Sequence, residues 1–385
     1  MPNKKNSYGL FEFNQAKLLS QRLDGVCYAY VDNQSIRINR SIHSRNFVQE
    51  GVRCYGKSLP IGGLPKPSIE KIRSYELISL LNEVTIDGHQ PDVVYAHFPL
   101  LTLTPRFVQE LTTRGIRLVC MEHWSKVRKT ELSQREASFL KHLVANSNAF
   151  CCVSVDLERS IRRITNDKAP IYVIPNMVSS EVFCPIHSKK EISREGDAYT
   201  FIALGRLVRD KKFDLVLDAF SRLSNKRTNL TIVGDGPDGK RLKRKTRALG
   251  VDRRVTFVGW LNSDEVASLL KMSDCYVSAS DDETFGVPFV EAWMCGIPCI
   301  GPSNNPLRDS FDETRGMLFE RNDIESLAEA MDAVSSDHCV NRVSTISPWA
   351  KSRFSEIVVI DRVIEVIKTA LQEKDSSTRM GKDAG

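Results

Sequence analysis

Two glutamates that stand eight residues apart, Glu283 and Glu291, are the acidic side chains whose surroundings point most clearly to chemistry. An apolar run ends at Ser278 before them, and Gly286 and Pro288 lie between them. Glycine lets a backbone approach a ligand closely, and proline fits the first turn of a helix because its missing N–H is not needed there. The pattern predicts a strand, a loop and a helix start, with one carboxylate before the turn and the other about one turn inside the helix.

The predicted helix start is also a candidate anion site. The backbone N–H groups of a first helical turn have no partner within the helix, so Phe285, Gly286 and Val287 are expected to present donors to a bound anion. The alternative is an acidic helix start that faces solvent and is favoured by the helix dipole alone. We favour a ligand site because glycine, proline and both acids occur together.

A second candidate segment follows the predicted strand at residues 199–204. It contains Gly205, Arg206 and Lys211. An arginine can bind phosphate oxygens in a bidentate way, and a lysine supplies a point charge. Open α/β sheets bind ligands at the carboxyl ends of their strands, which argues against two ordinary loop cations.

In the first half of the chain, His123 follows a predicted buried strand at residues 117–121. A neutral imidazole there could donate a hydrogen bond to a hydroxyl group; the alternative is a histidine whose hydrogen bonds are made within its own loop. His97 ends the preceding predicted strand and could line the same cleft. Gly9 lies in an early loop that leads into a predicted helix.

These segments resemble, in the same order, the landmarks of retaining glycosyltransferases with the GT-B fold, family 4 in particular. Glu283 and Glu291 are similar to that family's Glu-x7-Glu motif. The segment from Gly205 to Lys211 is similar to its Gly-Arg-Leu plus Lys segment, which contacts the donor diphosphate. The turn at residues 233–237 and the strand at residues 255–260 match two further landmarks. The resemblance covers about residues 170 to 370 well and the first half more loosely.

The resemblance implies an α/β protein of two doubly wound, Rossmann-like domains that face each other across a cleft. We assign residues 1–178 to an acceptor-side domain, 198–350 to a nucleotide-sugar-binding domain and 351–374 to a terminal helix that crosses back. A chain of 385 residues is too long for one core and suits two domains. With 41% hydrophobic and 26% charged residues, the composition is that of an ordinary globular protein.

The sequence departs from the family at two places. No apolar run precedes the loop and helix at residues 6–17, so the first strand of the first domain is missing. We expect a gap in that sheet, and we favour a missing upstream segment over a damaged, weakly stable protein. The family usually has glycine after its lysine, where this chain has Lys212.

The resemblance also implies roles for individual residues. The donor is a nucleotide-diphosphate sugar, whose diphosphate Arg206 and Lys211 contact. His123 and Glu283 contact the transferred sugar, and Glu291 accepts hydrogen bonds from the ribose. Gly9 is expected near the diphosphate or the acceptor. The remaining donor-contacting residues are Gly205, Gly234, Gly259, Phe285, Gly286 and Val287.

The implied chemistry needs no bound cofactor. The sequence contains no Asp-x-Asp motif, so cationic side chains rather than a metal are expected to neutralise the departing diphosphate. We name no nucleophile, because the family is thought to react on one face, with the departing phosphate taking the proton of the acceptor.

The leading interpretation is a retaining glycosyltransferase that moves a sugar onto a glycan or lipid-linked acceptor in surface polysaccharide synthesis. Two alternatives remain open. One is a sugar-nucleotide epimerase of the same fold, which would isomerise the donor without an acceptor. The other is a non-catalytic nucleotide-sugar-binding protein, which would bind the donor tightly without turnover.

The composition indicates the cellular compartment and limits the classes of partner that we expect. The sequence has no apolar run of eighteen residues and no secretory signal, and its 10 cysteines are scattered without metal-binding spacing. These features predict a cytoplasmic protein. The basic run at residues 240–247 is read as a solvated helix face, with peripheral contact to an anionic membrane or an acidic acceptor as the alternative. Nucleic acid is disfavoured, because no aromatic residues alternate with these cations.

Overall fold

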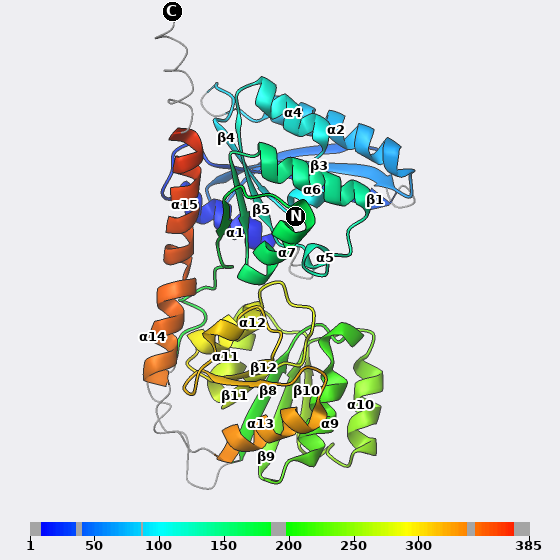
Figure 1. The fold of residues 1–385 in the computed structure, drawn as a ribbon, viewed down its shortest axis with the longest axis vertical. Helices are drawn as coiled ribbons and strands as arrows, with labels where there is room; N and C mark the ends of the chain where they lie inside the picture. The colour runs from blue at the N-terminus through cyan, green and yellow to red at the C-terminus, as the bar shows by residue number, and fades with distance from the viewer. Residues whose placement is uncertain (1–8, 36–40, 86–87, 186–197, 337–342, 373–385) are drawn as a thin grey trace, which may run out of the picture. The chain divides into compact units, whose positions relative to one another are not determined.

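The computed structural model describes residues 9–35, 41–85, 88–185, 198–336 and 343–372. Contacts divide the chain into two compact α/β units (Figure 1). The first unit consists of residues 1–174 with residues 360–385, and the second unit consists of residues 175–359. Residues 189–197, whose polar and charged composition predicts a linker, and the polar tail predicted from residue 375 lie outside the described residues.

The second unit contains a six-stranded parallel sheet with the order β10-β9-β8-β11-β12-β13. From β8 the chain proceeds to β9 and β10 on one side, and it then returns to place β11 on the other side of β8. This reversal is a topological switch point, where doubly wound sheets bind ligands. The strands are β8 (Tyr199–Leu204), β9 (Thr228–Val233), β10 (Val255–Gly259), β11 (Cys275–Val277), β12 (Cys299–Pro302) and β13 (Gly316–Phe319).

Helices cover this sheet because parallel strands must be buried on both faces. α9 contacts α10 and α13, whereas α12 contacts α14 and strands β11 and β12. The helical elements are η1 (Arg209–Lys211), α9 (Phe213–Arg222), α10 (Gly239–Ala248), α11 (Ser263–Met272), α12 (Val287–Met294), η2 (Arg308–Ser310), α13 (Ile324–Ser336), α14 (Val343–Phe354) and α15 (Glu356–Gln372), whose later residues belong to the first unit. Among the described residues of the second unit, the largest fully buried side chains are Trp293, Tyr276, Phe201, Phe220, Phe289 and Phe319.

The first unit contains two sheets instead of one. A three-stranded sheet has the order β1-β3-β2, and a four-stranded parallel sheet has the order β4-β5-β6-β7. The strands are β1 (Cys27–Ser35), β2 (His43–Gln49), β3 (Val52–Gly62), β4 (Val93–His97), β5 (Arg117–Glu122), β6 (Ala149–Cys152) and β7 (Ile171–Val173). The helices are α1 (Leu10–Ser20), α2 (Lys66–Glu83), α3 (Pro99–Thr102), α4 (Pro105–Thr113), α5 (Ser125–Arg128), α6 (Gln134–Asn146) and α7 (Val155–Thr165).

The gap expected in the first domain lies between these two sheets. Among the described residues, no strand precedes α1 and no hydrogen-bonded ladder joins β1 to β4, so both are edge strands. Consistent with this position, β1 and β4 keep partial exposure along most of their length, whereas β6 is buried throughout.

Strand β2 was not anticipated from the sequence. It pairs antiparallel with β3 through a two-residue turn at Glu50 and Gly51, both with positive φ (47° and 82°). Such turns match the twist of a hairpin, but glutamate is an unusual residue for one. The segment 351–374, expected to be one terminal helix, is divided between the end of α14 and α15, which begins at Glu356.

Candidate functional site

Three glycines end adjacent strands of the second unit and lie close together. The N–H of Gly205 donates to the carbonyl of Val233 (3.0 Å), and the N–H of Gly234 donates to the carbonyl of Gly259 (2.7 Å). A Cβ added at Gly234 would lie 1.9 Å from the carbonyl oxygen of Gly205, so no larger residue fits there. The structure therefore brings these three predicted residues to one edge of the sheet, at the ends of β8, β9 and β10.

Lys211 and Glu283 meet at the switch point. The Lys211 Nζ lies 2.5 Å from Glu283 Oε1, and the two side chains are 28% and 17% exposed. Lys211 comes from η1 after β8 and Glu283 from the loop after β11, and these two strands are neighbours in the sheet. Two residues that lie far apart in the sequence thus form one charged pair at the carboxyl edge.

Arg206 lies on the same loop as Lys211, directly after Gly205. Its side chain is exposed and forms no hydrogen bond or ion pair with any residue that the structure describes. A guanidinium in this state keeps all its donors available for an anion. The predicted cations therefore differ: Lys211 is paired with a carboxylate, and Arg206 is available.

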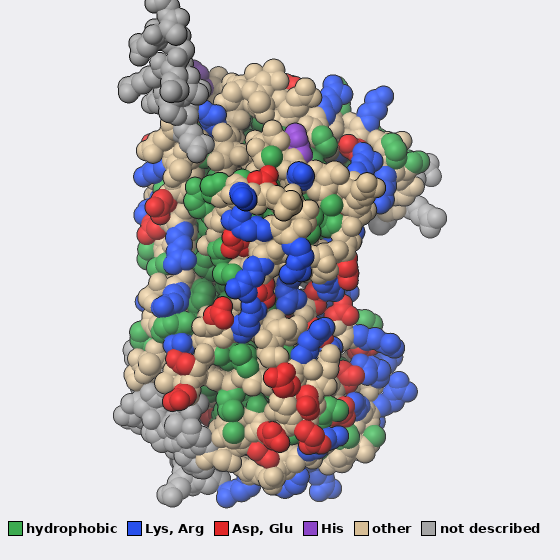
Figure 2. Space-filling view, in the orientation of Figure 1, with side chains coloured by type: hydrophobic (Ala, Val, Ile, Leu, Met, Phe, Trp, Pro, Cys, Tyr) green, Lys and Arg blue, Asp and Glu red, His purple; other side chains and the backbone are tan. Residues whose placement is uncertain are grey.

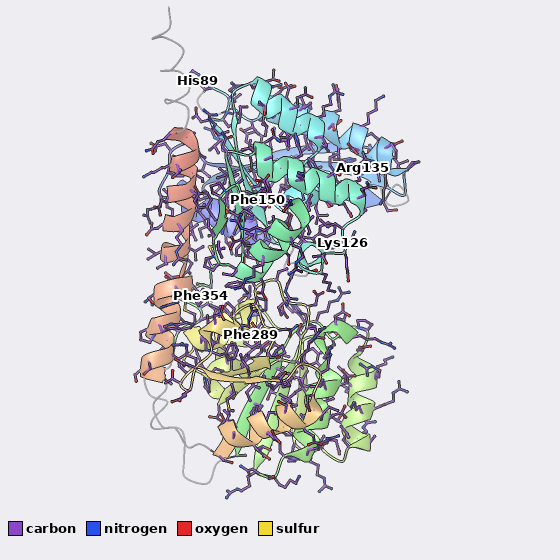
Figure 3. The ribbon with its side chains drawn as sticks, in the orientation of Figure 1. His89, Lys126, Arg135, Phe150, Phe289 and Phe354 are labelled. Carbon is purple, nitrogen blue, oxygen red and sulfur yellow. The ribbon has the colours of Figure 1, made fainter. Side chains whose placement is uncertain are left out.

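The predicted helix start is confirmed. α12 begins at Val287, directly after Gly286, whose φ of 95° is in the left-handed region, and Pro288 lies in its first turn. No side chain caps this helix end; Pro288 has no N–H and the N–H of Phe289 donates to the carbonyl of Gly286 (3.0 Å), so Val287 supplies the N–H donor of this turn. Phe285 is only 3% exposed and packs edge-on against Phe354 of α14, with ring centroids 5.9 Å apart. Figure 3 labels Phe354 together with Phe289 of α12. The turn is therefore held by apolar packing on one side.

Glu291 lies in the second turn of α12, where desolvation raises the pKa of its carboxyl to about 7. The buried phenol of Tyr276 lies within electrostatic range of both Glu283 and Glu291, and burial together with these carboxylates raises the pKa of that phenol well above its usual range. Glu283 and Glu291 therefore both lie near the same side chain of β11.

In the first unit, His123 follows β5 and is 8% exposed. Its Nε2 lies 3.0 Å from Nδ1 of His97 at the end of β4, so one ring nitrogen donates and the other accepts. Burial lowers the pKa of His97 to about 3, which keeps that ring neutral. The predicted pair of histidines is thus in direct contact.

Helix α1 packs against these histidines. The ring of Phe11 lies edge-on to His123, with centroids 5.9 Å apart. Gly9, the residue before α1, has a φ of 80°, and its carbonyl accepts a hydrogen bond from the hydroxyl of Tyr28 (3.4 Å). Gly9 therefore lies on the element that covers the histidine pair.

Glu122 is a functional candidate that the sequence analysis missed. It is fully buried, and its Oε1 accepts hydrogen bonds from the backbone N–H groups of His123 and Trp124, both at 2.8 Å. Desolvation raises the pKa of this carboxyl to about 7. An acid directly after four apolar strand residues was the available signal. Its carboxylate fixes the turn that presents His123.

The basic helix α10 is largely engaged with its own unit. Lys245 pairs with Asp218 (2.6 Å) and Arg241 with Asp238 (3.0 Å), while Lys243 lies over a neighbouring ring. Other Lys and Arg side chains remain at the surface around it (Figure 2). These local pairs favour a solvated helix face.

Within the described ranges, no cluster of three or more metal-ligating side chains was found, and no helix has the length and apolar character needed to cross a membrane.

Comparison with known proteins gives two family matches. The model for "Glycosyltransferase Family 4" matches residues 43–182, and the model for "Glycosyl transferases group 1" matches residues 186–348. The lipopolysaccharide core biosynthesis glycosyltransferase LpsD of Rhizobium meliloti is 26% identical over 245 residues, which cover 62% of this chain and 70% of that protein. This chain spans only 62% and 56% of the lengths of two further relatives.

Solved structures share the fold. Sucrose-phosphate synthase of Thermosynechococcus elongatus superposes with a TM-score of 0.75 at 16% identity, over 94% of this chain and 93% of that chain. Anabaena HepE, solved with UDP and glucose, gives a TM-score of 0.69 at 16% identity, over 96% and 97% of the two chains. The solved structures show that this chain has the GT-B fold. The two family matches, which lie one after the other along the chain, show that it belongs to the family 4 glycosyltransferases.

Proposed function

We propose that this chain is a retaining glycosyltransferase that moves a sugar from a nucleotide-diphosphate sugar to a glycan or lipid-linked acceptor. The observation that carries the proposal is the contact between Lys211 and Glu283 beside the available guanidinium of Arg206. Cations, an uncapped helix start and paired acids at a switch point suit a ligand that combines a diphosphate with a sugar.

The proposed roles of the cations follow from the negative charge that develops on the departing diphosphate. Cleavage of the bond between the sugar and the diphosphate leaves additional negative charge on the phosphate. Arg206, Lys211 and the N–H of Val287 at the start of α12 would stabilise that charge as it develops. We propose that Lys211 exchanges Glu283 for the phosphate, which frees the Glu283 carboxylate to accept hydrogen bonds from the sugar hydroxyls.

We assign the remaining contacts to separate parts of the donor: the ribose, the nucleotide and the sugar. Glu291 would accept hydrogen bonds from the ribose, and the glycine turns at Gly205, Gly234 and Gly259 would let the backbone approach the nucleotide closely. In the first unit, the paired imidazoles of His97 and His123 offer hydrogen bonds to sugar hydroxyls. Retention would follow if the departing phosphate accepts the proton of the acceptor on the same face, without a protein nucleophile.

A relative and the cysteines indicate the acceptor class and the compartment that we propose. LpsD is named for lipopolysaccharide core synthesis, which makes a surface glycan or its lipid-linked precursor the first acceptor to test. The nine cysteines in the described residues form no disulfide with one another, which suits a reducing cytoplasm. Because protein cations are assigned the role of neutralising the diphosphate, we expect transfer to proceed in the presence of EDTA.

A thermal-shift screen with UDP, ADP, GDP and their glucose conjugates is the first test. A ligand at one hundred times its dissociation constant should stabilise the folded protein by about 2.7 kcal/mol. Release of nucleoside diphosphate only when an acceptor glycan is present would support transfer. Isomerised donor sugar without acceptor would indicate an epimerase, and tight binding without turnover would indicate a non-catalytic protein. Either of these outcomes would overturn the proposal.

A further inference from the structure

Lys212 occupies a backbone conformation that suits glycine. Its φ and ψ are 48° and 38°, in the left-handed region, between η1 and α9. Residues with a Cβ adopt this conformation rarely, because the Cβ crowds the neighbouring carbonyl oxygen. The family resemblance also leads to the expectation of glycine here. A lysine at this position therefore needs a compensating role for its side chain.

The side chain of Lys212 joins three loops at the carboxyl edge of the sheet. Its Nζ pairs with Oδ2 of Asp281, after β11, and donates to Oδ1 of Asn322, after β13. Arg321 Nη2 lies 3.1 Å from the same Asp281 oxygen. Lys212 and Asp281 are 25% and 14% exposed, so solvent only partly screens their attraction.

This ion cluster lies next to the pair that carries the proposed function. Lys212 directly follows Lys211, and Asp281 precedes Glu283 by two residues, so two parallel ion pairs connect the same two loops. The loop after β11 carries three consecutive acids, Asp281, Asp282 and Glu283. An anionic ligand placed here would be repelled by any of these acids that lacks a nearby cation.

We propose that Lys212 is a charge-balancing residue for the donor diphosphate, and that it acts by neutralising Asp281. This inference rests on the proposed function, because it assumes that a diphosphate binds beside Arg206 and Lys211. Lys212 supports binding through Asp281, with which its ammonium group is paired, and Arg321 shares the task. Both cations also lower the pKa of Asp281, so this carboxyl stays ionised and its charge must be balanced.

The test compares UDP with uridine, which lacks the phosphates. Dissociation constants are measured by calorimetry for the wild type and for Lys212→Gln, in which the side chain stays polar but loses its charge. We expect Lys212→Gln to weaken UDP binding about tenfold, which corresponds to 1.4 kcal/mol, and uridine binding by less than twofold. Lys212→Arg keeps the charge and should bind UDP within about twofold of the wild type.

The decisive variant is Asp281→Asn combined with Lys212→Gln. If Lys212 acts by neutralising Asp281, removing that carboxylate restores UDP binding to within about threefold of the wild type, and Asp281→Asn alone binds UDP at least as tightly as the wild type. No restoration would overturn the proposal, since the lysine would then act on the phosphate directly. Equal losses for UDP and uridine would also overturn it, since they would indicate a structural role.

Two control variants separate an effect on folding from a failure of the proposed function. Lys212→Gly removes the charge while relieving the left-handed backbone, so it should remain folded and repeat the loss of UDP binding seen with Lys212→Gln. Arg206→Ala tests the proposed function itself. If UDP binds and Arg206→Ala weakens it while Lys212→Gln does not, only the present inference fails. If no nucleoside diphosphate binds the wild type, the proposed function fails.

Discussion

The ammonium group of Lys211 lies 2.5 Å from a carboxylate oxygen of Glu283, although the two residues are separated by 72 positions in the chain. In a donor-bound enzyme the two groups are expected to serve different parts of one ligand, the diphosphate and the sugar. Their direct pairing means that the site supplies its own counter-ion and keeps a partly buried cation neutralised.

This pairing leads to a first prediction, which a double-mutant cycle can test. We expect Lys211→Ala and Glu283→Gln to show a coupling of roughly 1 kcal/mol in the free energy of unfolding without ligand. The coupling should disappear when UDP-glucose saturates the protein, because the two side chains then contact different groups. Urea unfolding at both ligand conditions measures it, and a coupling unchanged by a bound donor would contradict the exchange of partners.

The second prediction concerns Arg206. Replacing it with alanine should weaken UDP binding about ten- to a hundredfold, as expected for the loss of charge-assisted hydrogen bonds of roughly 1.5–3 kcal/mol. Uridine binding should change little, and the melting temperature should stay the same because the side chain is exposed and unpaired among the described residues. Arg209→Ala, a change at another exposed arginine of the same loop, is the matched control. Equal losses of UDP and uridine binding would count against a phosphate contact.

The third prediction follows from the raised pKa of Glu291, which is about 7 in the folded protein against an ordinary value of 4.5. Between these values the folded state binds a proton more tightly than the unfolded state, so this group makes the free protein less stable as pH rises from 4.5 to 7. The ribose hydroxyls need the ionised carboxylate as an acceptor. UDP affinity should therefore increase as pH rises through 7.

The Glu291→Gln variant isolates this effect. Relative to wild type, it should flatten the pH dependence of the melting temperature between about pH 5 and pH 7, because a neutral amide does not titrate. The wild-type dissociation constant for UDP should rise roughly tenfold from pH 8 to pH 6 beyond any change seen in the variant. Parallel pH profiles in the two proteins would show that Glu291 is not the titrating group.

The sequence was sufficient for the parts of the site that depend on local pattern. The apolar run before Gly205 located the end of β8, and Gly286 with Pro288 located the start of α12, whereas the ends of β9 and β10 came from the family resemblance. In each case a short-range constraint, either a turn that excludes Cβ or a helix end that tolerates proline, is written in neighbouring residues.

The parts that the sequence did not predict depend on tertiary contacts. The pairing of Lys211 with Glu283 requires β8 and β11 to be neighbours, which is a property of strand order. Strand β2 has polar, mostly exposed residues and lacks the apolar alternation that marks a strand. The burial of Glu122 and the compensated backbone of Lys212 follow from what surrounds them in three dimensions. Local pattern carries no information about such neighbours.

The fourth prediction tests the glycine turns. Gly234→Ala should destabilise the protein by more than about 3 kcal/mol, because its Cβ would lie 1.9 Å from the carbonyl oxygen of Gly205 and its φ of 134° is unfavourable for alanine. Gly250→Ala is the matched control: its φ of 66° is also positive, but no atom lies within 4 Å of the added Cβ. That variant should lose only about 1 kcal/mol. Similar losses in urea unfolding would show that backbone strain alone, rather than the contact with Gly205, sets the cost.

The fifth prediction concerns the histidine pair of the first unit. His97 is neutral and lies 3.0 Å from Nε2 of His123, so it fixes the ring orientation of His123 and biases its tautomer. Replacing His97 with phenylalanine keeps an aromatic ring against Phe11 but removes the hydrogen bond. We expect kcat to fall about tenfold with UDP-glucose as donor, while KM for the donor changes little.

A matched change distinguishes this role from simple packing. His97→Asn retains a side-chain hydrogen-bonding group near His123 but loses the ring, and it should recover part of the lost kcat if the hydrogen bond matters more than the aromatic contact. The tautomer of His123, read from the nitrogen shifts of its imidazole by NMR, should be mixed in His97→Phe and single in the wild type. If His97→Phe keeps full kcat and a single tautomer, the hydrogen bond between the two rings has no catalytic role, and Glu122, which holds the backbone of His123, would be sufficient to place the ring.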